Sequence, residues 1–197
     1  MLALVLALAA CGEPSGAADP GDASSTGAPA LPAPDGYYLP LACGMTVRVG
    51  QGNASDFSHN GDLRYAFDLL IDLDTPVHAM AEGVVREVYA ANRPGDPCHD
   101  GGDQSCQPFA NFVLLGHGDG TTSIYKHLNS VQVAVDARVA RGAVVGLSGS
   151  TGWSTRPHVH VMRMGDCGRS DCPSIPLEFV EAGVPVTGQD VTSLNCP

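Results

Sequence analysis

Hydrophobic residues gather in short runs after residue 37, and turn-forming residues separate these runs. No long stretch shows the apolar spacing of an amphipathic helix, and many runs are rich in β-branched and aromatic residues. Clusters such as Asn60-Gly61-Asp62 and Gly149-Ser150-Thr151-Gly152 are typical of turns. The pattern therefore predicts an all-β domain over residues 37–197. Its expected strands lie at residues 45–49, 65–71, 77–80, 84–90, 112–115, 121–125, 131–135, 143–147 and 157–164.

The first 36 residues differ in texture from the rest of the chain. Residues 1–11 form an apolar run that ends in Cys11, too short for a mature membrane-spanning helix, which takes about 20 apolar residues. The run predicts a signal peptide, and its end resembles a bacterial lipobox in which Cys11 is lipidated, although no basic residues precede it. A plain secretory signal is the alternative. Residues 12–36 are rich in Ala, Gly, Pro, Ser and Asp and predict a flexible linker.

The charge of the chain bears on its partners and location. The net charge is -11 at pH 7, which argues against nucleic acid as a partner. With the predicted signal, we expect an exported protein of the periplasm or cell envelope, held to a membrane through Cys11. Nothing in the sequence fixes an oligomeric state, and a monomer is the default expectation.

The cysteine count predicts disulfides. Without Cys11, six cysteines remain, and an even number in an exported chain is typical of disulfide bonds. Six cysteines allow about 15 pairings. Sequence proximity favours Cys98–Cys106 and Cys167–Cys172, which leaves Cys43–Cys196 to join the ends of the domain. A cysteine metal site is the rival interpretation, but no C-x-x-C spacing supports it.

Histidines supply the candidate chemistry. His158 and His160 are two residues apart in an expected strand, so both side chains project from the same face. His127 ends another expected strand, and His59 lies upstream with Asp68 after it. A catalytic zinc ion takes three nitrogen or oxygen ligands from the protein and keeps a position for water, and a nearby imidazole can act as base. The set predicts a zinc hydrolase.

The order of four sequence blocks resembles the lysostaphin/LytM-type zinc endopeptidases, also called the β-lytic metallopeptidase family. The resemblance covers about residues 58–164. It implies a single antiparallel β-sheet domain of the LytM/lysostaphin type, akin to a duplicated hybrid motif, and a Zn²⁺ endopeptidase acting on peptidoglycan peptides. The blocks are residues 59–61 with 65–68, 75–79 with 83–85, 111–128, and 146–160.

Carried over residue by residue, the resemblance makes His59, Asp68 and His160 the zinc ligands. It makes His127 and His158 a catalytic pair outside the metal's ligand set. Such imidazoles can accept the proton of the attacking water, stabilise an oxyanion or protonate the leaving amine.

This sequence departs from the family pattern at three points. The family pattern is His-x-x-x-Asp, whereas Asp68 follows His59 by nine residues. A longer turn through residues 62–64 would bridge that gap, and Asp62 is the competing ligand. Asp74 and Arg156 stand where the family usually or often has Gly, so the shape or charge preference of the site could differ.

Several alternatives stay open at this point. A LytM-like regulator that activates a wall amidase without catalysis is the main rival, and a peptidase acting on proteins is another. A VanX-like carboxypeptidase is disfavoured because no carboxylate precedes His158. We expect His78, His99 and His117 to be ordinary partly buried histidines and Asp72 and Asp74 to be solvated turn residues. Trp153 either stacks on substrate or caps the core.

Overall fold

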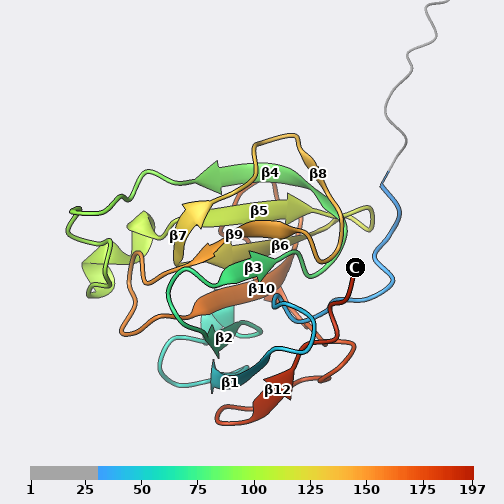
Figure 1. Ribbon diagram of the computed structural model, residues 1–197, viewed down its shortest axis with the longest axis horizontal. Helices are drawn as coiled ribbons and strands as arrows, with labels where there is room; N and C mark the ends of the chain where they lie inside the picture. Colours follow the sequence, from blue (N-terminus) through green and yellow to red (C-terminus); the bar gives the residue numbers. More distant parts are fainter. Residues whose placement is uncertain (1–30) are drawn as a thin grey trace, which may run out of the picture.

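A computed structural model describes residues 31–197, and the regular secondary structure of these residues is almost entirely β-strand (Figure 1). This confirms the predicted all-β, antiparallel fold class. The predicted signal segment, residues 1–11, and most of the predicted linker lie outside the described residues. Within the described part, no helix is both long and apolar enough to cross a membrane.

The strands divide between two antiparallel sheets. The large sheet has nine strands in the order β12-β1-β2-β10-β6-β5-β4-β8, with β11 also paired to β10, and the small sheet has the order β3-β9-β7. The elements are β1 (Thr46–Gln51), η1 (Gly61–Leu63), β2 (Phe67–Leu70), β3 (Pro76–His78), β4 (Gly83–Tyr89), η2 (Gln104–Phe109), β5 (Phe112–Gly116), β6 (Thr121–Lys126), β7 (Leu128–Val131), β8 (Arg138–Val139), β9 (Val144–Ser148), β10 (Val159–Gly165), β11 (Ser174–Ile175) and β12 (Asp190–Thr192).

Most expected strands are present, but one prediction was wrong. The strand expected at residues 131–135 ends at Val131. Val133 packs against the core, but Gln132, Ala134 and Val135 are exposed, and residues 132–135 carry no strand pairing. The sequence pattern did not predict the short elements β8, β11, β12, η1 and η2, each of which is only a few residues long.

The large sheet has two different faces. On one face Phe67, Leu69, Val159 and Val161 alternate with outward residues and join the main core, which includes residues of the small sheet. Strand alternation places the intervening residues on the opposite face, which carries a smaller apolar cluster that includes Met162.

A row of side chains crosses that opposite face. Strand pairing aligns Asp68 of β2 with His160 of β10, and His160 with Lys126 of β6. Gln51 on β1 and Phe112 on β5 continue the row on either side. Directly paired residues share a face, so residues far apart in sequence meet here.

Three disulfides tie the described domain together: Cys43–Cys196, Cys98–Cys106 and Cys167–Cys172. This confirms the pairing favoured by sequence proximity. Cys43–Cys196 spans 153 residues and joins the two ends of the described domain, while the other two close short loops.

Candidate metal centre

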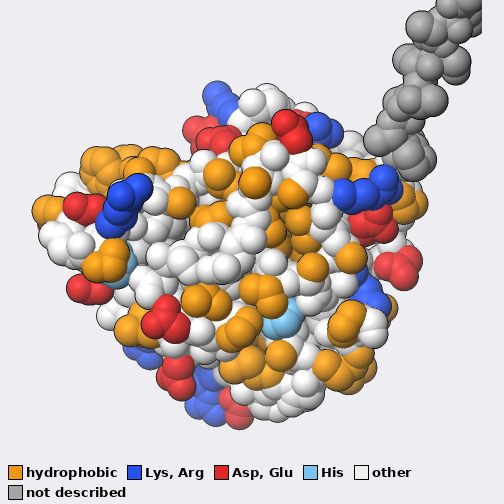
Figure 2. Space-filling model, turned by 45° about the horizontal axis from the view of Figure 1, so that its top comes forward, with side chains coloured by type: hydrophobic (Ala, Val, Ile, Leu, Met, Phe, Trp, Pro, Cys, Tyr) orange, Lys and Arg blue, Asp and Glu red, His pale blue; other side chains and the backbone are white. Residues whose placement is uncertain are grey.

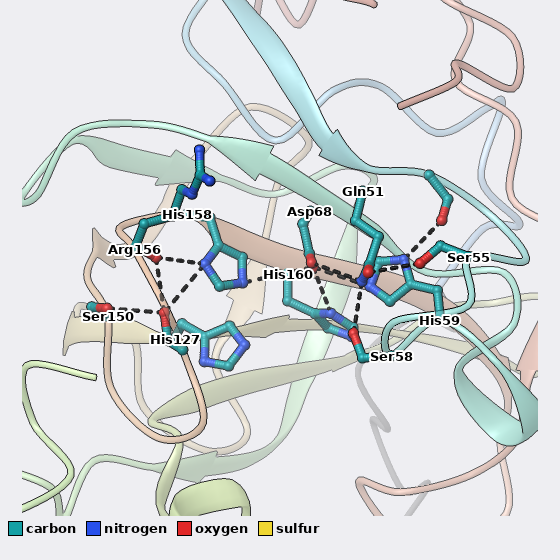
Figure 3. Close-up of polar contacts among 12 residues, drawn as sticks. Gln51, Ser55, Ser58, His59, Asp68, His127, Ser150, Arg156, His158 and His160 are labelled. Carbon is teal, nitrogen blue, oxygen red and sulfur yellow. Dashed lines mark hydrogen bonds and ion pairs between the residues drawn. The ribbon is translucent and has the colours of Figure 1, made fainter. Parts of the chain in front are cut away.

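Three side chains from separate segments converge on the open face of the large sheet (Figure 3). Asp68 comes from β2, His160 from β10, and His59 from the connection between β1 and β2. Asp68 Oδ1 lies 3.2 Å from His59 Nε2 and 2.9 Å from His160 Nδ1. Each side chain offers a ligand atom within 4.8 Å of the others, and both histidines are buried. The sheet therefore gathers a compact set of metal-ligating atoms.

A hydrogen bond to Gly52 fixes the orientation of the His59 ring. Its Nδ1 lies 2.9 Å from the Gly52 carbonyl oxygen, which only accepts, so Nδ1 is the donor. In the neutral ring Nε2 then presents a lone pair to the Asp68 carboxylate. That contact is favourable only when His59 is protonated or a cation lies between the two atoms. His160 Nε2 is buried and has no hydrogen-bond partner among the described residues.

The protonation states also suit metal binding. Burial lowers the pKa of His160 to about 4, more than the neighbouring Asp68 carboxylate raises it. Burial alone would raise the pKa of Asp68, but His160 and His59 hold it well below its usual value. At neutral pH the pair is thus a neutral imidazole and a carboxylate, the forms that bind metals.

Gln51 supports the carboxylate, and sequence reasoning missed it. Its side-chain amide donates to Asp68 Oδ2 at 3.1 Å and to Ser58 Oγ at 2.7 Å, while Ser55 donates to Gln51 Oε1. A register shift between Val49 and Gln51 brings Gln51 opposite Asp68. No sequence motif marks Gln51, because its role depends on that bulge and on the pairing of β1 with β2.

A second pair of imidazoles lies beside the three ligand-type residues. The rings of His127 and His158 are 4.4 Å apart, and His158 Nε2 lies 3.7 Å from Asp68 Oδ1. His127 Nδ1 donates to the Thr151 carbonyl at 2.7 Å, and His158 Nδ1 donates to the Arg156 carbonyl at 2.8 Å. Both rings therefore keep Nε2 free of the proton in their neutral forms.

Burial, reinforced by the nearby His158 and His160, holds the pKa of His127 well below its usual value. His127 also has a left-handed backbone, with φ of 66°, at the point where the chain passes from the large sheet into β7. A positive φ is uncommon outside glycine, and such residues concentrate at functional sites. The turn aims a neutral ring at the cluster.

The carbonyls of Thr151 and Arg156 belong to one loop, and hydrogen bonds with a second loop hold it in place. Gly152 donates its N–H to the Cys98 carbonyl at 2.7 Å, and Gly102 donates to Ser154 at 3.2 Å. Gly152 has φ of 83°, and a Cβ there would lie 2.6 Å from Ala110 Cβ. The Cys98–Cys106 loop thus packs tightly on the segment that holds His127 and His158.

The remaining candidates fall where the sequence suggested. Asp62 is exposed on η1 and is not among the clustered ligand atoms, whereas η1 provides the turn expected between His59 and Asp68. Asp74 is exposed with φ of 59°, which accounts for glycine at this position in the family pattern. Trp153 is half-buried, lies 5.9 Å from the Phe57 ring and lines the pocket beside the histidines.

His78, His99 and His117 lie outside the cluster and bond elsewhere. Nδ1 of His78 and of His117 donates to the carbonyls of Gly142 and Glu82, and His99 contacts Asp100. Burial lowers the pKa of His117. These contacts agree with ordinary partly buried histidines.

Comparison with known protein families shows to which family the chain belongs. The model of peptidase family M23 matches residues 63–172, more than half of the chain. The chain belongs to peptidase family M23. The match includes Asp68, His127, His158 and His160, and begins just after His59.

Two bacterial relatives illustrate the similarity, and one of them is named as a peptidoglycan DD-endopeptidase. Lysostaphin of Staphylococcus simulans is 33% identical over 135 residues, which are 68% of this chain and 24% of that protein. The peptidoglycan DD-endopeptidase ShyA of Vibrio cholerae is 34% identical over 116 residues, 59% of this chain and 21% of that protein. The chain thus spans about a quarter or less of the length of these relatives.

A solved M23 structure shares the fold. The catalytic domain of the prophage-encoded protein EnpA from Enterococcus faecalis superposes with a TM-score of 0.52 at 20% identity. The superposition covers 70% of this chain and 94% of that one. This likeness supports the LytM/lysostaphin-type fold expected from the sequence.

Proposed function

We propose that this M23 protein is a zinc-dependent endopeptidase that hydrolyses peptide bonds in peptidoglycan stem peptides or cross-bridges. The observation that carries the proposal is the convergence of two histidines and one carboxylate beside a second, unliganded pair of imidazoles. A regulator without catalysis would need neither the complete ligand set nor the aimed pair.

The residues fit a zinc ion. Ligand atoms about 2.0–2.2 Å from a tetrahedral zinc ion lie about 3.3–3.6 Å apart. The distances from Asp68 Oδ1 to His59 Nε2, 3.2 Å, and to His160 Nδ1, 2.9 Å, approach that spacing. A cation would also remove the lone-pair conflict between His59 and Asp68. We assign His59, Asp68 and His160 as its ligands.

The second imidazole pair supplies the proton chemistry. When bound, zinc activates a water molecule and polarises the peptide carbonyl. His127 and His158 each hold Nδ1–H on a main-chain carbonyl, so Nε2 of one can accept the water's proton. The other ring, once protonated, can donate to the oxyanion or to the leaving amine.

The cellular setting follows from the proposed chemistry. Peptidoglycan peptides as substrate agree with the name of the peptidoglycan DD-endopeptidase ShyA, and they require a location in the cell envelope. We propose that residues 1–11 direct export, that Cys11 anchors the chain in a membrane and that residues 12–36 act as a tether. Residues 37–197 then form the peptidase domain.

The decisive experiment is digestion of purified peptidoglycan with zinc, followed by mass analysis of the released muropeptides. Asp68→Ala is expected to abolish metal binding and release of fragments. Asp62→Ala, an exposed carboxylate removed outside the cluster, is the matched control and is expected to act like the wild type.

Three results would redirect the assignment. Zinc bound without any released fragment, together with stimulation of an added wall amidase, would support the regulator instead. Full zinc content in Asp68→Ala would remove Asp68 from the ligand set. Cleavage of glycine-rich proteins, but not of wall peptides, would favour a protein-degrading peptidase.

A further inference from the structure

The charges around the metal centre are distributed unevenly. Two adjoining pockets meet there and share Phe57, Asp68, Thr155 and His158, so together they form one groove across the site. Of the 21 acidic residues in the chain, Asp68 alone lines this groove among the described residues. Its carboxylate contacts His59 and His160, the other two proposed metal ligands.

Basic side chains, in contrast, line both parts of the groove. Lys126 lies in the part near His127, and Arg48 and Arg156 line the part beyond Asp68. Arg48 is already paired with Asp190, its Nε 2.9 Å from the carboxylate. The charged side chain of Lys126 interacts electrostatically with the carboxylates of Asp171 and Glu87. In a protein with net charge -11, the groove is a local exception.

Arg156 is the basic group most available to a ligand. It is exposed, and its guanidinium forms no ion pair or hydrogen bond with any described residue. Figure 3 shows this group extending away from the imidazole of His158, while the backbone carbonyl of the same residue accepts the His158 Nδ1 proton. The main chain of Arg156 therefore serves the site already described, and its side chain has no such role.

A guanidinium offers paired N–H donors that match a carboxylate, and it stays charged at all relevant pH values. Figure 2 shows acidic and basic side chains both scattered over the one face of the molecule that it draws. An unpaired guanidinium in a groove without competing acids is suited to bind an anionic group on the substrate.

We propose that Arg156 binds a free carboxylate of the peptide, so that the enzyme prefers carboxylate-bearing stem peptides over uncharged bridges. This inference rests on the proposed function, since it names the substrate class of that same site. A neutral glycine bridge has no carboxylate of its own for Arg156 to bind.

The test compares two cross-linked stem-peptide dimers that differ only in whether the carboxyl next to the cleaved link is free or amidated. For the full wild-type chain with zinc, kcat/KM is expected to be about five- to tenfold higher on the free dimer, the scale of one exposed ionic hydrogen bond. In Arg156→Gln the preference should disappear through loss on the free dimer alone. Arg156→Lys should restore part of it.

Arg93→Gln is the matched control, because it removes one exposed arginine that lines neither part of the groove. It should keep the wild-type preference. Equal rates of the wild type on both dimers, or an equal loss on both in Arg156→Gln, would overturn the proposal. The second result would mean that the side chain only shapes the loop before His158.

Binding of the uncleaved stem tetrapeptide, free or amidated, separates this inference from the proposed function. A wild type that cuts neither dimer but binds the free peptide better, with the difference lost in Arg156→Gln, would contradict the endopeptidase and support carboxylate recognition. Equal binding of both peptides would contradict the inference even if cleavage occurs.

Discussion

At the scale of single residues, the site depends on which nitrogen of each imidazole is free. Main-chain carbonyls hold Nδ1–H of His59, His127 and His158, so each ring turns Nε2 toward the cluster. His160 instead faces Asp68 with Nδ1. The rings therefore differ in what surrounds them rather than in residue type.

The first prediction separates ligand from base. His160→Ala should lose most of its zinc, because one of three protein ligands is gone. His158→Ala should keep zinc and lose activity on the order of 10²- to 10⁴-fold, the scale for a missing acid–base group. Elemental analysis and muropeptide release measure the two effects, and equal zinc loss in both variants would refute the division of roles.

The second prediction concerns the stability of the metal-free protein. Its folded state keeps His160 neutral down to a pKa of about 4, against a usual 6.5, because the ring is buried. The unfolded chain takes up this proton at higher pH, so stability should fall as pH drops from 6.5 to 4, by on the order of 3 kcal/mol. The pKa of His127 is shifted in the same direction.

Urea unfolding with a chelator, at several pH values between 7 and 4, measures this dependence. His160→Asn should flatten the curve over that window. The lowered pKa of Asp68 also makes stability fall as pH drops, but it does so below the usual Asp value of 3.8 and therefore outside this window. An unchanged slope in His160→Asn would show that another group controls it.

At the scale of elements, a disulfide loop and a glycine-rich turn hold the pair of His127 and His158. The Cys98–Cys106 loop bonds to Gly152, and the same turn carries the Thr151 carbonyl that holds His127. Thr151 Oγ1 also accepts from the Asn111 N–H at 3.0 Å. The position of the pair thus depends on segments outside the large sheet.

The third prediction removes this clamp. Replacing both Cys98 and Cys106 by Ser should lower kcat while zinc content stays near normal, because the ligands lie on β2, β10 and the segment of His59 instead. Replacing Cys167 and Cys172 by Ser is the matched control, a short loop away from Thr151. If both double variants lose the same activity, general destabilisation rather than loss of the clamp is responsible.

At the scale of the whole molecule, the two ends of the described domain are joined. Cys43–Cys196 closes a loop of 153 residues, and Arg141 donates hydrogen bonds to Asn195 and to the Cys196 carbonyl. The Asn195 amide also donates to the Leu39 and Ala79 carbonyls, at 3.0 Å each. The chain end is therefore part of the fold rather than a loose tail.

The fourth prediction follows from loop length. The Cys43→Ser/Cys196→Ser variant should lose up to about 5 kcal/mol of unfolding free energy in the chain-entropy model, against about 2 kcal/mol for Cys167→Ser/Cys172→Ser. Urea unfolding measures both. The folded fraction should retain its activity, because the bond lies outside the groove. Activity lost without a change in stability would contradict this account.

The sequence by itself determined the elements and the chemistry. Short β-rich runs between turn signals predicted most strands, and the two-residue spacing of His158 and His160 predicted that both rings lie on one side. The resemblance to the family pattern pointed to His59, Asp68 and His160 as ligands, with Asp62 as the competitor, and local spacing favoured two of the three disulfides. These features depend on contacts between near neighbours, which sequence patterns reveal.

Only the tertiary structure decided how these parts meet. The strand expected at residues 131–135 ends at Val131, because the residues that follow find no partner strand. A bulge in β1 places Gln51 opposite Asp68. Asp68 contacts His160, which lies 92 residues later in the chain, because β2 pairs with β10. Register is set by long-range hydrogen bonds and core packing, and no local spacing records it.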